Sequence, residues 1–411
     1  MDANNKILKF ENVQLNIEKL SFIIGKIEVF LKDLNNIPSL PAFRNEFLQH
    51  QTALGIHSVL AWDGDIIPVE NIKQILSGKP LSQGKKFQED EVQELSKISK
   101  ELFNEIIIEN KRPEITPEYI KKLHHVSSDN IVDRSDVELD EWLKEFCLYL
   151  SGLDGLFNVQ FHNWGVDEKT ASIVNAIIAH AYFIWMQPFE TSNYKTAHLL
   201  ESSILLKGGM PYLALNVLPI FYYETKAEHT KQIEFLKDGE DLTSFLEYAL
   251  LGICDGIESI ILAKLSQLFI LAWQQHIQIQ LSLDETAGSK VTQRRTELMH
   301  AIPLLNDNGL TFEQILILTP SIAKAYAKGA KTARRDLAAL TEFGLLVKRK
   351  RKYCPNVIAV MGEVAGNSAL LQIEIIAKKE TGYSHHVKPV ITSIELKAEL
   401  RQMLGKLQAG E

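Results

Sequence analysis

Apolar residues are densest between Ile173 and Met210, and their spacing predicts two helices separated by a short polar break. The first helix has apolar side chains on several faces, which is typical of a helix buried at the centre of a domain. Pro188 should end it, because the residue before a proline avoids the helical region. The second helix should run from about Lys195 to Leu206 and stop at Gly208–Gly209. A helix, a polar loop and a new helix N-terminus form an arrangement that can hold an anion.

Helical spacing also dominates the rest of the chain up to residue 282. Thr116 and Pro117 mark one helix start, as a cap and a first-turn proline. A short strand-like segment is expected before residue 17, and the charged residues 85–91 are expected to form an exposed connection. The fold class is therefore predicted to be mainly all-α. Besides the helix at Thr116, the expected helices cover residues 17–34, 42–54, 92–108, 139–156 and 243–282.

The pattern changes after the polar residues 282–290, which we take as a domain boundary. One helix is expected over residues 310–316, a second begins within 321–326, and a third ends at Gly344. A strand and a basic wing should follow up to residue 353. The string KTARRDLAALTEFGLL, which begins at residue 331, is similar to the winged helix-turn-helix fold.

Composition places this chain of 411 residues among soluble globular proteins of two or three domains. A net charge of −8 argues against general affinity for nucleic acid and leaves a local basic patch open. Cys147, Cys254 and Cys354 lack a C-x-x-C spacing, which suits a reducing compartment without disulfide or zinc framework. We expect a cytoplasmic protein without a membrane partner, because no apolar run reaches membrane-spanning length and no signal peptide is recognisable.

The polar break resembles the central motif of the Fic (filamentation induced by cAMP) family. That motif reads roughly H-P-F-x-(D/E)-G-N-G-R-x-x-R, after H-x-x-F on the entering helix. The matching residues are His180, Phe183, Pro188, Phe189 and Asn193. The resemblance covers about residues 40–355 in the right order. It implies a Fic-type helical bundle with an N-terminal helical extension and a C-terminal winged helix domain, which is common in this branch of the family.

Active relatives transfer the AMP of ATP to a hydroxyl of a target protein, and the resemblance assigns the roles in that reaction. The family histidine takes the hydroxyl proton, and the family acid holds magnesium. Gln187 stands at the histidine position, and its amide cannot accept a proton near pH 7. Thr191 stands at the acid position, and a hydroxyl holds a cation weakly compared with a carboxylate. Losing a general base alone costs on the order of 10²–10⁴ in rate.

The nucleotide-binding positions of the family have changed as well. Ser192 and Tyr194 replace two glycines, whereas Lys195 and His198 replace two arginines. A tyrosine removes the bare backbone that would approach phosphate, a lysine loses the two-pronged geometry, and a histidine is mostly neutral at pH 7. Asn193 is the nucleotide-binding position that is kept. ATP and magnesium are therefore expected to bind weakly or not at all, and no metal ligand is assigned.

A second landmark lies upstream, where Asp63 and Gly64 resemble the end of the family's inhibitory motif, (S/T)-x-x-x-E-(G/N). Val59 stands at the hydroxyl position of that motif. The resemblance implies that Asp63 pairs with His198. The alternative is that Asp63–Gly64 is only a turn. The flap that aligns the target protein in active relatives is shortened here to about residues 127–135.

Eight cations within 22 residues form a local positive group in this acidic chain. They lie at the start of the expected recognition helix and in the wing: Lys331, Arg334, Arg335, Lys348, Arg349, Lys350, Arg351 and Lys352. A winged helix can place such groups on the phosphates and bases of DNA. The alternative is a solvated charged surface on a module that contacts another protein.

Together, these patterns predict four regions. Residues 1–110 form an N-terminal helical region with the inhibitory-like segment, 111–285 a Fic-like core, 291–360 a winged helix and 361–411 a tail. The preferred function is a catalytically impaired regulatory protein with a DNA- or protein-binding winged helix. The alternatives are an active protein adenylyltransferase with a non-standard site, and a DNA-binding transcriptional regulator. The expected partners are a nucleotide, DNA, an unidentified protein and a second copy of the chain.

Overall fold

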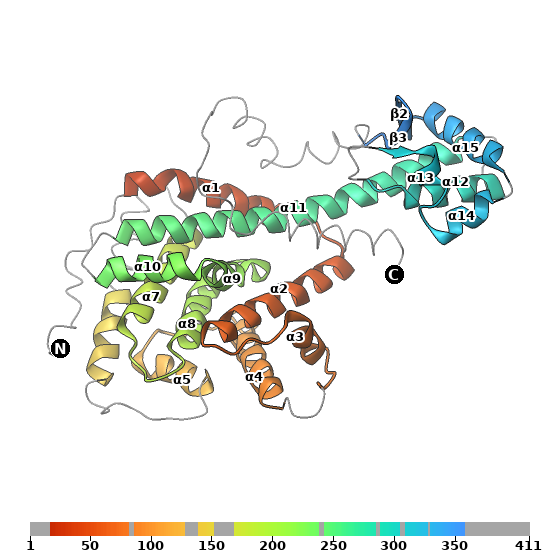
Figure 1. The fold of residues 1–411 in the computed structure, drawn as a ribbon. Helices are drawn as coiled ribbons and strands as arrows, with labels where there is room; N and C mark the ends of the chain where they lie inside the picture. The colour runs from red at the N-terminus through yellow and green to blue at the C-terminus, as the bar shows by residue number, and fades with distance from the viewer. Residues whose placement is uncertain are drawn as a thin grey trace. The chain divides into compact units, whose positions relative to one another are not determined.

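The computed structural model describes residues 17–81, 86–127, 139–151, 168–237, 242–284, 288–304, 309–327 and 329–357. These residues are mostly helical, as predicted, and include one small sheet (Figure 1). They belong to two compact units. Of the described residues, unit 1 contains those up to Asn36 and Leu40–Ile260, and unit 2 contains Ile37–Ser39 and those from Ile261 onward. The division falls upstream of the polar segment where the sequence places a boundary. The expected strand-like start, the flap beyond Ser127 and the tail lie outside the described residues.

Unit 1 is made of helices. They are α1 (Ile17–Asn36), α2 (Pro41–Trp62), α3 (Val69–Leu76), α4 (Lys86–Phe103), the π-helix η3 (Asn104–Ile108), α5 (Pro117–Ser127), the helical residues 139–151, α7 (Glu168–Met186), α8 (Asn193–Lys207), the 3-10 helix η4 (Tyr212–Ala214), α9 (Val217–Glu224), α10 (Lys226–Lys237) and the first part of α11 (Leu242–Ser282). α8 packs along α7 and also contacts α2, α4, α5 and η3. Its residues from Tyr194 to Leu206 are therefore all buried, although many are polar.

The ends of the two central helices follow from the local sequence. α7 stops at Met186, and Gln187 before Pro188 has a left-handed backbone with φ of 48°. α8 ends at Gly208, followed by Gly209 with φ of 78°. A Cβ on Gly208 would lie 2.2 Å from the Cβ of Ser172, so this glycine allows α7 and α8 to approach closely.

Three sequence-based boundaries are corrected. α2 continues through Gly55 to Trp62, and the glycine lets the helix approach Asn216, whose Oδ1 would lie 2.2 Å from a Cβ at that position. Residues 86–91, expected as an exposed connection, form the first turns of α4, where acidic side chains suit the positive end of the helix dipole. The helix expected from residue 310 begins at Phe312 and is preceded by a short strand.

Unit 2 combines small helices with a three-stranded antiparallel sheet. After α11 come α12 (Lys290–Ala301), β1 (Leu310–Thr311), α13 (Phe312–Ile315), α14 (Pro320–Tyr326), α15 (Ala330–Glu342), β2 (Leu346–Arg349) and β3 (Lys352–Pro355). The strand order is β1-β3-β2, with Arg349 opposite Lys352 beside the turn between β2 and β3.

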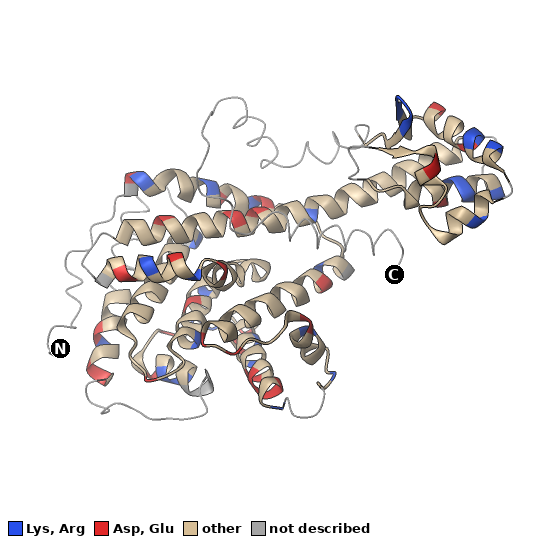
Figure 2. Ribbon diagram, in the orientation of Figure 1, with Lys and Arg blue, Asp and Glu red and all other residues tan. Residues whose placement is uncertain are grey.

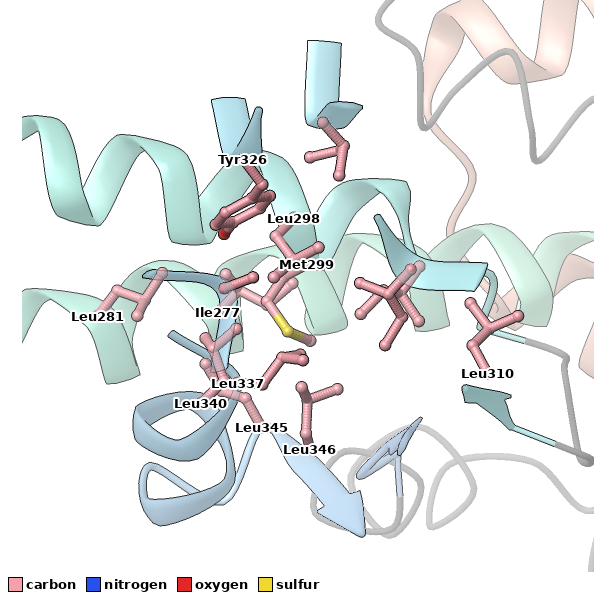
Figure 3. Packing of buried hydrophobic residues seen from close by; sticks show 14 of the residues in the cluster. Ile277, Leu281, Leu298, Met299, Leu310, Tyr326, Leu337, Leu340, Leu345 and Leu346 are labelled. Carbon is pink, nitrogen blue, oxygen red and sulfur yellow. The ribbon is translucent and has the colours of Figure 1, made fainter. Parts of the chain in front are cut away.

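The core of unit 2 is a single cluster of buried apolar residues (Figure 3). Trp273, Ile277 and Leu281 enter it from the end of α11, and Leu337 and Leu340 enter it from α15. Capping supports the helices around it: the Thr319 hydroxyl accepts a hydrogen bond from the Ile322 N–H at the start of α14, 3.2 Å away. α15 is thus fixed by its apolar face, and its other face is left to polar residues.

Among the residues described by the structure, no helix has the combination of length and apolar character that a bilayer crossing requires.

Candidate functional site

The loop between α7 and α8 is closed by its own polar groups. The Asn193 side chain donates a hydrogen bond from Nδ2 to the Phe189 carbonyl (2.7 Å) and accepts one at Oδ1 from the Phe189 N–H (3.0 Å). Thr196 Oγ1 donates to the Ser192 carbonyl at 2.9 Å, and Ser192 itself is left-handed with φ of 54°. Asn193 therefore shapes this loop, and two residues with left-handed backbones, Gln187 and Ser192, stand at its ends.

The positions of the family histidine and acid lie at the surface of this loop. Gln187 and Thr191 are both exposed, as is Glu190 between them. Phe189 is buried and stacks on the ring of His124, with ring centres 3.6 Å apart. Among the described residues, none of these three side chains forms a hydrogen bond or an ion pair, and Glu190 is the one of the three that carries a carboxylate. Within the described part of the chain, moreover, no group of three or more His, Cys, Asp or Glu residues could hold a metal ion.

Lys195, at the position of the first family arginine, is buried and already paired. Its Nζ lies 2.9 Å from Glu91 Oε1, and both side chains are largely shielded from solvent. Glu91 comes from α4, the segment that the sequence had indicated as an exposed connection. Burial raises the pKa of Asp63, and the Lys195 charge opposes that rise. Lys195 therefore faces carboxylates of its own chain, which compete with any phosphate for its charge.

Asp63 and His198 were expected to pair, and the structure gives them different neighbours. The charges that act on Asp63 come from Lys195, Asp65, Lys226 and Glu91. Burial lowers the pKa of His198 to about 4, so the imidazole is neutral at pH 7. Asp63 and Gly64 follow the last residue of α2 as a turn, with Gly64 at φ of 109°.

An aromatic ring occupies the position of the second family glycine. Tyr194 is buried, and its ring stacks on Trp62 of α2 with centres 4.2 Å apart and planes within 5°. The Nζ atom of Lys226 lies 4.8 Å from the centre of the Trp62 ring and 2.8 Å from the Trp62 carbonyl oxygen. The Tyr194 hydroxyl is buried without a hydrogen-bond partner among the described residues.

Behind Tyr194 lies a buried polar cluster that the sequence did not reveal as a unit. His180 Nε2 is 3.2 Å from His229 Nε2, and His180 Nδ1 is 3.8 Å from Glu201 Oε2. Tyr222 donates its hydroxyl to Glu201 Oε1 at 3.2 Å. Burial raises the pKa of Glu201 well above its ordinary value and lowers that of His180, while it lowers the pKa of His229 to about 3. Burial thus opposes the charged form of each of these groups, so the cluster offers no readily charged base.

The eight cations singled out in unit 2 are all exposed, and we call them the basic surface. None of them forms a salt bridge with a carboxylate among the described residues. Arg334 lies over the Phe312 ring at 5.0 Å and Lys348 over the Tyr353 ring at 5.5 Å, contacts that orient the side chains and keep their charge. Figure 2 shows Lys and Arg at α15 and at the turn between β2 and β3.

Lys350 lies in the turn between β2 and β3 with φ of 58°. Glycine, asparagine or aspartate is preferred at such positions, because a larger side chain strains the left-handed backbone. The chain therefore keeps a lysine at the end of this hairpin at some conformational cost. A strained residue at a charged tip is an observation that favours a functional role.

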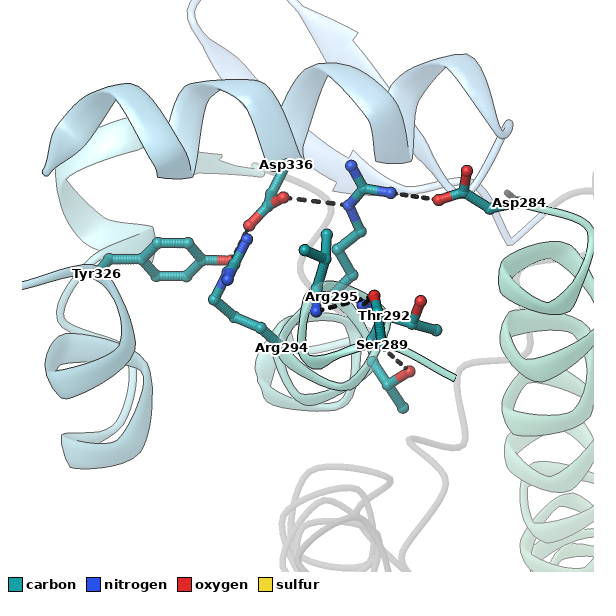
Figure 4. A network of polar contacts seen from close by, with 9 residues as sticks. Asp284, Ser289, Thr292, Arg294, Arg295, Tyr326 and Asp336 are labelled. Carbon is teal, nitrogen blue, oxygen red and sulfur yellow. Dashed lines mark hydrogen bonds and ion pairs between the residues drawn. The ribbon is translucent and has the colours of Figure 1, made fainter. Parts of the chain in front are cut away.

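The recognition-helix candidate α15 is anchored by its single buried acid (Figure 4). Asp336 accepts hydrogen bonds from Arg294 Nε (2.7 Å), Arg295 Nε (3.1 Å) and the Tyr326 hydroxyl (3.1 Å). Arg295 also donates from Nη1 to Asp284 at 2.6 Å. The acid that would weaken the positive face of α15 is turned inward and neutralised, so Lys331, Arg334 and Arg335 remain free on the outside.

Charge is distributed unevenly along the sequence. Residues 290–357 contain 13 Lys and Arg against five Asp and Glu, a net charge of +8, whereas the whole chain carries −8. The sequence outside this stretch is therefore strongly acidic. General attraction to a polyanion is weak for such a chain, and the positive field is confined to unit 2.

Comparison with known proteins adds no relative to this description, because neither a family model nor a curated protein matches the chain.

Proposed function

We propose that the protein is a DNA-binding regulator in which unit 2 is a winged helix and unit 1 is a Fic-like scaffold without the catalytic groups. The observation that carries the proposal is the basic surface: eight exposed cations without salt bridges on α15 and on the hairpin of β2 and β3. Phosphate contacts by lysine and arginine supply most of the affinity of such modules for DNA.

The order of elements supports a winged helix. α12, β1, α13, α14, α15, β2 and β3 follow one another along the chain, and the sheet order is β1-β3-β2. In a winged helix the helix before the hairpin enters the major groove, and the hairpin reaches the flanking backbone. α15 takes the first of these roles and the hairpin, with Lys350 at its turn, takes the second. The Asp336 contacts hold α15 against α12 and α14.

The Fic-like part of the proposal has its support in the loop. Asn193 and Phe189 form the loop contacts, while Gln187 and Thr191 supply no base and no carboxylate. Lys195 is paired with Glu91, and Tyr194 is stacked on Trp62. Transfer of AMP from ATP is therefore not expected. Incubation of the purified chain with labelled ATP, alone and with cell lysate, should leave proteins unlabelled, and label that disappears in an Asn193→Ala variant would overturn this part.

DNA binding is tested by fluorescence anisotropy of short genomic duplexes with the full-length chain over a series of salt concentrations. The wing variant replaces the five hairpin cations by glutamine: Lys348, Arg349, Lys350, Arg351 and Lys352. It should weaken binding by about 100-fold or more at low salt, and the slope of log K against log salt should shrink by up to about 4.5, because each lost phosphate contact removes about 0.9 from the slope.

The matched control also loses five positive charges, at exposed lysines of unit 1. These are Lys79, Lys86, Lys97, Lys100 and Lys122. The control variant should keep the salt slope of the unmodified protein, because those lysines contact no DNA. Equal weakening by both variants would reduce the effect to net charge, and absence of binding by the unmodified protein at low salt would exclude DNA as the ligand.

A further inference from the structure

Unit 1 contains a small cavity that none of the exposed residues of the loop between α7 and α8 lines. It lies among α2, α4, α8 and the segment that follows η4. Ile56 and Leu206 contribute apolar wall, whereas Thr52, His198, Ser202 and Asn216 contribute polar groups. Gln187, Thr191 and Lys195 are not among its lining residues. His198 was grouped with the nucleotide-binding positions from the sequence, and the fold turns it toward this separate space.

His198 is the group in this cavity that points to a ligand. The residue is 6% exposed, and its Nδ1 is buried without a hydrogen-bond partner among the described residues. A buried polar atom without a partner costs on the order of 1–3 kcal/mol, so such atoms are normally satisfied by protein, water or a ligand. Thr52, Ser202, Tyr212 and Asn216 add hydroxyl and amide groups to the same lining. The cavity wall thus combines an unpartnered imidazole nitrogen with groups that can share a hydrogen-bonded molecule with it.

The chemistry of the lining defines the class of molecule that fits. No Lys, Arg, Asp or Glu lines the cavity. An ion would therefore enter without a counter-charge, which is strongly unfavourable in a buried site. A neutral imidazole carries one N–H donor and one acceptor nitrogen, and hydroxyls and amides also do both. The cavity therefore matches an uncharged molecule that both donates and accepts hydrogen bonds.

Its volume limits the size of that molecule. The space measures about 30 Å³, and a water molecule needs about 10–15 Å³ on this measure. The cavity accommodates about two water-sized groups, which corresponds to a molecule of a few non-hydrogen atoms or to the tip of a longer one.

We propose that this cavity is a binding site for a small uncharged amide or alcohol, which His198 and Ser202 hold by hydrogen bonds. The inference goes beyond DNA binding and does not depend on it. His198 and Ser202 are four residues apart and lie on one face of α8, so both can reach the same group.

The test uses formamide, with formate as a charged control that has the same number of non-hydrogen atoms. Full-length protein with ¹⁵N-labelled histidine rings is titrated, and the His198 ring resonances are assigned with a His198→Gln variant. Formamide should shift the His198 ring nitrogens saturably, with a dissociation constant in the millimolar range, as suits so small a ligand. Formate at equal concentrations should leave them in place.

A Ser202→Leu variant fills the cavity and should abolish the formamide shift. If circular dichroism shows that this variant is unfolded, Thr52→Val serves instead, because it keeps the shape and removes one hydroxyl, and it should weaken binding several-fold. Absence of saturation with formamide would mean that the cavity holds only water and would overturn the proposal. An equal response to formate, or a shift that persists in the folded Ser202→Leu variant, would overturn it too.

Discussion

The region of the loop between α7 and α8 and the basic surface of unit 2 both contain positively charged side chains. Their surroundings differ. In the loop region Lys195 is buried and lies 2.9 Å from Glu91, and the neighbouring Tyr194 stacks on Trp62. On the basic surface every cation is exposed. A resemblance in sequence therefore indicates a ligand only when the fold leaves the charged groups accessible.

The acids of the two regions are also used differently. In unit 1 Glu91 pairs with the buried Lys195 and neutralises its charge. In unit 2 Asp336 points away from the surface and neutralises Arg294 and Arg295 in the interior. This difference explains how an acidic chain can have a positively charged face. The local electrostatic field depends on the charges that stay exposed at the surface.

The largest expected effect of a single substitution concerns the anchor of α15. Asp336→Asn leaves Arg294 without its carboxylate and Arg295 with Asp284 alone, and breaking such a buried pair should lower the free energy of unfolding of unit 2 by about 3 kcal/mol. Glu342→Gln on the same helix is the control, since Glu342 is exposed and its replacement should change stability by less than about 0.5 kcal/mol. Urea unfolding followed by pulsed hydrogen exchange reads α15 directly. Similar small effects of both variants would contradict the anchoring role.

Acidification should destabilise unit 1 before unit 2. Burial lowers the pKa of His198 from 6.5 to about 4 and that of His229 to about 3, so the folded state holds these protons less tightly than the unfolded state. The contribution of these neutral histidines to the free energy of unfolding is complete above about pH 6.5. It is lost as the pH falls toward 4, by about 3 kcal/mol for His198 alone. Exchange of α8 amides, compared with α15 amides at pH 7 and pH 5, measures this loss. A His198→Gln variant should show a smaller pH dependence, and an unchanged one would refute the assignment.

The buried pair of Lys195 and Glu91 should couple more strongly than an exposed pair. A double-mutant cycle with Lys195→Met and Glu91→Gln should give a coupling energy of about 2 kcal/mol, because both side chains are largely withdrawn from water. The control is Lys97 with Glu101, an exposed pair 3.9 Å apart on α4, for which about 0.4 kcal/mol is expected. Coupling of similar size in both cycles would show that Lys195 is as open as a surface lysine.

The smallest expected effect distinguishes two buried tyrosines. Tyr194→Phe removes a hydroxyl without a partner, so the free energy of unfolding should stay constant or rise by up to about 1 kcal/mol. Tyr222→Phe removes the donor to Glu201 and should lower it by about 1 kcal/mol. Thermal unfolding of both variants is sufficient. A clear loss in Tyr194→Phe would mean that its hydroxyl has a partner in solution.

Local signals predicted much of the fold. Pro188 ended α7, Gly208 ended α8, and the spacing of residues 243–282 indicated α11 almost to its limits. The sequence did not predict the short strand β1, because two residues are too few to show a hydrophobic period. They form a strand because they pair with Tyr353 and Lys352 of β3. The first turns of α4 were missed because their acidic residues resemble a solvated connection.

The candidate site was less predictable, because its partners are distant in sequence. Glu91 lies 104 residues from Lys195, and Trp62 is similarly remote from Tyr194. No rule of sequence spacing relates residues so far apart, and the motif alone suggests a loop whose side chains are open to solvent. The residues of the basic surface could be named from the sequence, because long cationic side chains on a hairpin and on the polar face of a helix are usually exposed.

The contrast between a closed and an open cationic region is tested most directly by lysine acetylation footprinting of the full-length protein, with and without duplex DNA. Lys331, Lys348, Lys350 and Lys352 should react rapidly in the free protein and become protected by DNA, whereas Lys195 should react slowly in both conditions. Rapid acetylation of Lys195 in the folded protein, or wing lysines that DNA leaves fully reactive, would contradict the account.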